Sequence, residues 1–70
     1  MSNRTELILA VDELVEQLRT EQRVLDTSST AGHLSITYGD SGMDRDEIIH
    51  ELERFAVLKG VPILSGNTAA

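Results

Sequence analysis

Few side chains in this sequence could do chemistry: two histidines and a set of carboxylates, with no cysteine beside them. His50 and Glu51 begin like the zinc-binding HExxH pattern, but Arg54 occupies the position of its second histidine. With one histidine in the pattern and no cysteine in the chain, no zinc ligand set is indicated. We therefore expect structural or surface roles for both histidines.

A run of acids between residues 40 and 51 could suggest a calcium loop. Asp40 and Glu51 stand at positions 1 and 12 of a segment with EF-hand length. However, Gly42 stands at position 3, and Arg45 occupies position 6, where the loop needs glycine. Acids at the start of a helix are favoured by the helix dipole. We expect no metal and no other cofactor.

The segment Gly39-Asp40-Ser41-Gly42 resembles the GDSG that surrounds the nucleophile of chymotrypsin-like serine proteases. Met43 then stands where that family has a further glycine, and the likeness covers four residues of 70. The family implies two β-barrels and a triad with an oxyanion hole, which need far more chain than this. Glycine, aspartate and serine are also typical turn residues. We expect a turn and no enzyme activity.

An amphipathic helix is predicted over residues 4–25. Its apolar residues recur at spacings of three, four and seven, which places them in one narrow arc. The arc is long for so small a domain, so it is also predicted to form the seam of a homodimer. Packing within the chain is the alternative. The expected dimer-interface residues are Leu7, Val11, Leu14, Val15, Leu18 and Leu25.

The remainder of the chain is predicted to hold a loop over 26–32, a strand over 33–38, a helix over 45–59 and a short extended segment over 61–64. Strict alternation in His-Leu-Ser-Ile-Thr-Tyr indicates the strand. Asp44 and Glu47 form a capping box for the second helix, and Gly60 is typical of a helix end. If 33–38 and 61–64 pair, they form a minimal parallel βαβ unit.

These elements predict a mostly helical α+β fold. Residues 1–64 are expected to form one small domain, and residues 65–70 a flexible tail. The absence of cysteine and of a long apolar run favours a cytoplasmic protein.

Twelve acids against six bases give a net charge of −6. The bases are scattered, so direct nucleic-acid binding and anionic membranes are disfavoured. So small a chain also rarely encloses an active-site pocket.

The favoured function is that of an acidic, protein-binding regulator, an inhibitor or adaptor, acting as a homodimer on the surface of a target protein. The alternatives are an assembly subunit with oligomer contacts only, and an acidic mimic of nucleic acid. Residues expected to contact the partner are exposed acids and leftover apolar side chains on the two helices: Glu13, Glu16, Glu51, Glu53, Val57 and Leu58.

Overall fold

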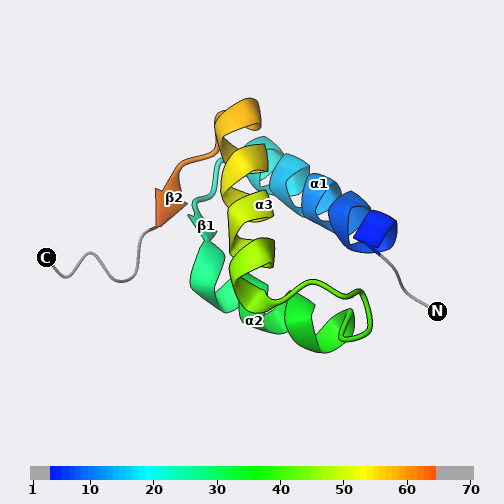
Figure 1. Cartoon of the computed structure of the whole chain (residues 1–70). Helices are drawn as coiled ribbons and strands as arrows, with labels where there is room; N and C mark the ends of the chain where they lie inside the picture. The colour runs from blue at the N-terminus through cyan, green and yellow to red at the C-terminus, as the bar shows by residue number, and fades with distance from the viewer. Residues whose placement is uncertain (1–3, 65–70) are drawn as a thin grey trace, which may run out of the picture.

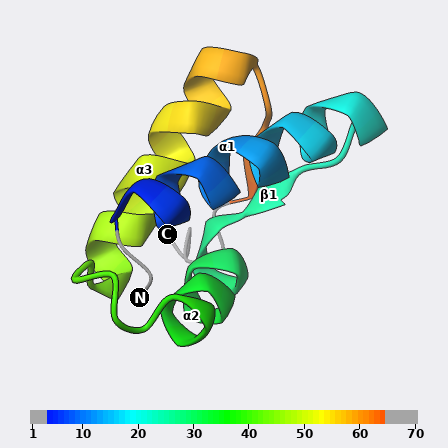
Figure 2. The ribbon, with the colours of Figure 1, turned by 90° about the vertical axis from the view of Figure 1, so that its right-hand side faces the viewer.

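The computed structural model describes residues 4–64 and is mostly helical, with one small parallel sheet. The α3 helix packs against both α1 and α2, as two perpendicular views show (Figures 1 and 2). Within the described residues, no helix is long and apolar enough to cross a membrane. The elements in chain order are α1 (Arg4–Glu21), β1 (Leu25–Asp26), α2 (Thr27–Thr37), α3 (Arg45–Lys59) and β2 (Ile63–Leu64).

Helix α1 ends at Glu21, so the prediction of a helix to residue 25 is wrong in its last turn. Gln22 adopts a left-handed conformation with φ 57°. The Gln22 amide donates to the Arg19 carbonyl at 3.2 Å, and the Arg23 amide donates to the Leu18 carbonyl at 2.9 Å. This is the Schellman arrangement that reverses the chain after a helix. Leu25 is still fully buried, but from β1.

The predicted loop over 26–32 and strand over 33–38 are wrong, because α2 covers most of both segments. The Asp26 carboxylate caps the helix by accepting from the Ser29 amide at 3.1 Å. The alternation at 34, 36 and 38 suggested one buried strand face, yet Leu34 is 4% exposed and Ile36 is 84% exposed. The buried residues instead follow a helical spacing of four and three: Thr27, Ala31 and Leu34.

Helix α3 occupies the residues over which the sequence predicts a helix. Its capping box is complete: the Glu47 amide donates to the Asp44 carboxylate at 2.9 Å, and the Asp44 amide donates to the Glu47 carboxylate at 3.1 Å. Gly60 ends the helix with φ 76°. The Val61 amide donates to the Ala56 carbonyl at 2.8 Å, so the chain turns back toward β1.

The sheet pairs β2 with β1, in parallel, rather than with residues 33–38. Leu25 lies opposite Ile63 and Asp26 lies opposite Leu64. Pro62 has no amide hydrogen, but its carbonyl accepts from the Leu25 amide at 2.9 Å. The crossover therefore contains two helices, α2 and α3, instead of one.

A single core joins all of these elements. It is built from aliphatic residues and one methionine, as the scarcity of aromatic residues requires. The predicted tail over 65–70 lies outside the described residues. The core residues are Leu7, Val11, Val15, Leu25, Ala31, Leu34, Met43, Ile48, Leu52, Ala56 and Val61.

Candidate protein-binding surface

The stripe expected to form a dimer seam is largely covered by the chain itself. Four of its six residues are fully buried within the single chain: Leu7, Val11, Val15 and Leu25. Leu14 and Leu18 are partly buried against the same core. The stripe is therefore used for packing of α1 within the fold. Dimerisation itself remains a prediction.

The largest exposed apolar side chains of α3 are Val57 and Leu58, near its C-terminal end. They are 75% and 72% exposed. The core side of α3 repeats every four residues, at Ile48, Leu52 and Ala56, so residues 57 and 58 must point elsewhere. A shallow open hollow brings them together with charged and polar neighbours. We name its lining residues the α3 outer face: His50, Glu53, Arg54, Val57 and Leu58.

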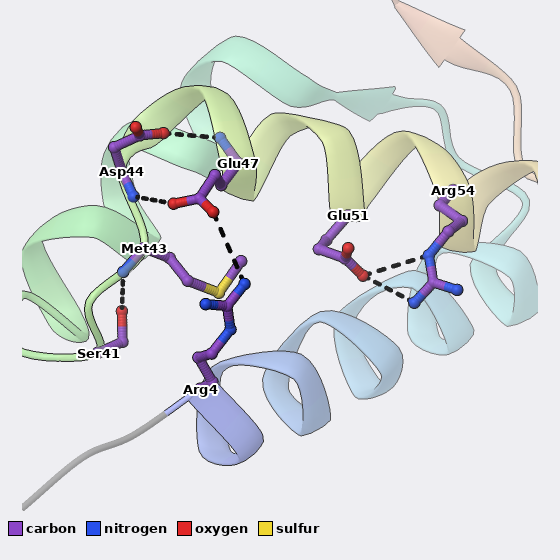
Figure 3. Close-up of polar contacts among 7 residues, drawn as sticks. All are labelled: Arg4, Ser41, Met43, Asp44, Glu47, Glu51 and Arg54. Atoms are coloured by element: carbon purple, nitrogen blue, oxygen red, sulfur yellow. Dashed lines mark hydrogen bonds and ion pairs between the residues drawn. The ribbon is translucent and has the colours of Figure 1, made fainter.

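Two of the expected partner-binding acids lie on α3 in different environments. Glu53 is exposed on the α3 outer face and makes no hydrogen bond or ion pair with the other described residues. Glu51 is half-buried and accepts two hydrogen bonds from Arg54, at 2.8 and 3.3 Å (Figure 3). The Arg54 guanidinium also lies over the Phe55 ring, 5.3 Å from its centre. Glu51 therefore positions Arg54, whereas Glu53 is available to a partner.

The other two expected acids, Glu13 and Glu16, lie on α1. Glu16 accepts hydrogen bonds from Arg19 and from Lys59, the latter at 3.1 Å. Lys59 also pairs with Asp12 at 2.9 Å. The hydrogen bonds from Arg19 and then Lys59 lower the pKa of Glu16 to about 2. Glu16 thus joins the end of α3 to α1, while Glu13 is exposed and outside this cluster.

The pKa of Lys59 is raised by its hydrogen bonds to Asp12 and Glu16. Both carboxylates favour the charged ammonium, so Lys59 stays charged over the whole neutral range.

The first turn of α3 is joined to α1 by a looser contact. Arg4 reaches Glu47 at 3.6 Å, with both side chains well exposed (Figure 3). Asp46 is exposed beside them and has no hydrogen bond or ion pair with the described residues. The expected set of contact residues omitted Asp46. The sequence pattern that could have identified Asp46 is its spacing, four residues before His50 and seven before Glu53. Residues with this spacing lie on one face of a helix.

The segment that resembles the protease motif, residues 39–42, lies in the turn before α3. Ser41 is buried in the turn, where its hydroxyl accepts a hydrogen bond from the Met43 amide at 3.3 Å. Figure 3 shows this Ser41–Met43 contact just ahead of α3. Among residues 4–64, no group of three His, Asp or Glu side chains is arranged to hold a metal ion. The arrangement at the α3 outer face is suited to binding through apolar contact and charge.

A scan against protein-family models, a search of curated proteins and a search of solved structures each gave no match to this chain. The functional argument therefore depends on the geometry of its surface.

Proposed function

We propose that this protein is a non-enzymatic regulator, an inhibitor or adaptor, that binds a target protein through the α3 outer face. The observation that supports the proposal is the adjacent pair Val57 and Leu58, both about three-quarters exposed. A protein of 70 residues has little apolar material to spare for its core. Two adjacent aliphatic side chains that share one hollow are therefore better explained by contact with a partner than a single exposed residue such as Ile36 is.

The apolar area of the α3 outer face and the net charge of the chain both favour reversible binding of a target protein. Full burial of one aliphatic side chain of this size stabilises a complex by about 1.5–3 kcal/mol. Two such side chains give a small apolar centre, and the polar side chains of His50, Glu53 and Arg54 line the same hollow beside it. The net charge of −6 attracts targets with basic surfaces and accelerates their association.

The homodimer remains a prediction of the sequence and needs a surface other than the buried stripe of α1. Light scattering over a dilution series measures it directly. A mass that stays at 7.7 kDa at every concentration removes the dimer from the proposal and leaves the target-binding surface intact.

The test of the proposed function is affinity capture with matched baits. The intact chain, the double variant Val57→Lys/Leu58→Lys and a control Ile36→Lys are immobilised, and circular dichroism establishes that all three are folded. Ile36 is a suitable control because it is exposed on α2 and is not one of the residues of the α3 outer face. We expect a target retained by the intact chain and the control to be lost by the double variant. Equal capture by all three baits contradicts the proposal.

A captured target also allows the regulatory role to be measured. Addition of the chain to the purified target should change the activity of that target in proportion to occupancy, and the double variant should have no effect. If binding is abolished by the variant but the activity of the target never changes, the protein is an assembly subunit rather than a regulator.

A further inference from the structure

The exposed side of α3 changes character along its length. Two parallel rows of side chains follow it, each with spacings of four, three and four residues, as one face of a helix requires. Each row begins with an acid, has one further acid at its second or third position, and ends with an aliphatic residue. The rows are Asp46, His50, Glu53, Val57 and Glu47, Glu51, Arg54, Leu58.

The acids of the two rows differ in whether they already have a cation. Glu47 pairs with Arg4, and Glu51 pairs with Arg54. Asp46 and Glu53 are exposed and have no ion pair with any described residue. The row that ends at Val57 therefore carries two uncompensated carboxylates. A partner with Lys or Arg at the matching positions supplies the complementary charge.

We propose that the exposed side of α3 binds an amphipathic, basic helix of the target protein. Apolar side chains of this helix cover Val57 and Leu58, and its Lys or Arg side chains lie over Asp46 and Glu53. The proposal rests on the proposed function, because it names the kind of partner segment that the same surface accepts.

The geometry of α3 favours a helix over an extended segment. The amides and carbonyls in the middle of α3 are bonded within the helix, so a partner gains only side-chain contacts there. An extended segment normally recovers its own main-chain hydrogen bonds from the edge of a sheet. The two rows are not part of the β1–β2 sheet, so they offer no such edge. A helix satisfies its own backbone and can present side chains alone.

The rows also define the spacing that the partner must have. Val57 lies eleven residues after Asp46 and four after Glu53, which is about 16 Å and about 6 Å along a helix. A partner helix lying along α3 therefore needs one base about one turn from its apolar pair and a second base about three turns from it, all on one face. Two apolar residues and two bases on one face satisfy this requirement.

The experiment uses labelled helical peptides as probes and the full chain as receptor. One peptide carries two leucines at one end and two lysines on the same face, one about one turn and the other about three turns away. Its mate has glutamates in place of the lysines. Both are made in each sequence direction, because the partner can run parallel or antiparallel to α3. Fluorescence anisotropy at low salt should show binding of a lysine peptide about tenfold tighter than of its glutamate mate. Equal binding of the two overturns the proposal.

Charge reversals on the receptor locate the contact. Asp46→Lys and Glu53→Lys should each weaken the lysine peptide several-fold and partly restore the glutamate peptide. Glu13→Lys is the matched control, since it makes the same change of net charge at an exposed site on α1. If Glu13→Lys weakens binding as much as Glu53→Lys, only the overall charge matters and the proposed orientation is wrong.

The outcomes separate this inference from the proposed function. One outcome keeps the proposed function but overturns the inference of a basic partner helix. In that outcome the captured target is lost with Val57→Lys/Leu58→Lys. It still binds Asp46→Lys and Glu53→Lys, and the lysine peptide does not displace it. A doubled mass that Val57→Lys returns to 7.7 kDa identifies a second copy as the occupant and also overturns the basic partner helix. Displacement of the target by duplex DNA assigns the face to nucleic-acid mimicry instead.

Discussion

Gln22 and Gly60 occupy equivalent positions at the ends of α1 and α3. Both have positive φ, of 57° and 76°, and both are followed by an amide that bonds back to the last turn. Glycine adopts this conformation without steric cost, whereas a residue with a Cβ is strained there. The α1 terminus therefore stores a small strain that the α3 terminus lacks.

We expect Gln22→Gly to stabilise the protein by about 0.5–1 kcal/mol, because the relief of strain exceeds the entropy that glycine adds to the unfolded chain. Gly60→Ala should destabilise it by about 1 kcal/mol for the opposite reason, although nothing lies within 4 Å of the added Cβ. Urea unfolding of both variants measures the two effects. A loss of stability in Gln22→Gly would contradict the inference that Gln22 is strained at the end of α1.

The lowered pKa of Glu16 predicts that the stability of the fold depends on pH. Its pKa in the folded protein is lowered from 4.5 to about 2, so its stabilising contribution is present above pH 4.5 and is lost as pH falls toward 2. We expect Glu16→Gln to lower the Tm at neutral pH, and the difference from the intact protein to shrink between pH 4.5 and 2. Thermal unfolding across this range tests it. Glu13→Gln on the same helix is the control and should show a much smaller difference at neutral pH.

At the scale of elements, α2 is the segment where local pattern and tertiary packing disagree. It contains serine, threonine and glycine, which are poor helix formers, and it has no charged residue in its first or last turn. Ser35 and Thr37 donate hydrogen bonds to the carbonyls of Gly32 and His33. The Asp26 cap and the burial of Ala31 and Leu34 against α3 and the rest of the core outweigh these preferences.

A pair of substitutions distinguishes a helix from a strand at this segment. In a strand, residues 34 and 36 share one face and both substitutions should be costly. In α2, Leu34→Ala should cost about 2–3 kcal/mol and Ile36→Ala less than about 0.5 kcal/mol, because Leu34 is buried and Ile36 is exposed. Chemical denaturation gives both values. Similar losses of stability in the two variants would contradict the assignment of this segment to a helix.

At the scale of the whole molecule, the dominant electrostatic feature is the excess of six negative charges on a fold with a radius of gyration of 11.6 Å. Exposed ion pairs such as Arg4–Glu47 and Arg23–Glu21 stabilise by only about 0–1 kcal/mol each. Repulsion among the remaining acids opposes the compact state. Added salt therefore stabilises the fold more by screening this repulsion than it destabilises the fold by screening the ion pairs.

We expect the Tm to rise when ionic strength increases from about 0.01 M to about 0.15 M, since the screening length falls from about 30 to about 8 Å. Differential scanning calorimetry in sodium chloride measures the change. Glu13→Lys, which removes two units of negative charge at an exposed site, should raise the Tm at low salt and reduce its salt dependence. A Tm that falls with salt would show that local ion pairs dominate.

Elements whose residues satisfy several local rules at once are predictable from the order of their residues alone. Helix α3 has an apolar period, a capping box and a terminal glycine, and each of these acts within a few residues. The buried positions of α1 follow from its period in the same way. The exposure of Val57 and Leu58 also follows, because they lie off the apolar stripe of α3.

The remaining features depend on contacts between residues that are far apart in the chain, so local patterns do not predict them. Leu25 is opposite Ile63 in a sheet of two residues per strand, and nothing local to either residue indicates that pairing. The helical state of α2 depends on the core that it covers. Lys59 is held by Asp12 and Glu16, 47 and 43 residues earlier, and this cluster separates Glu16 from the acids that stay free for a partner.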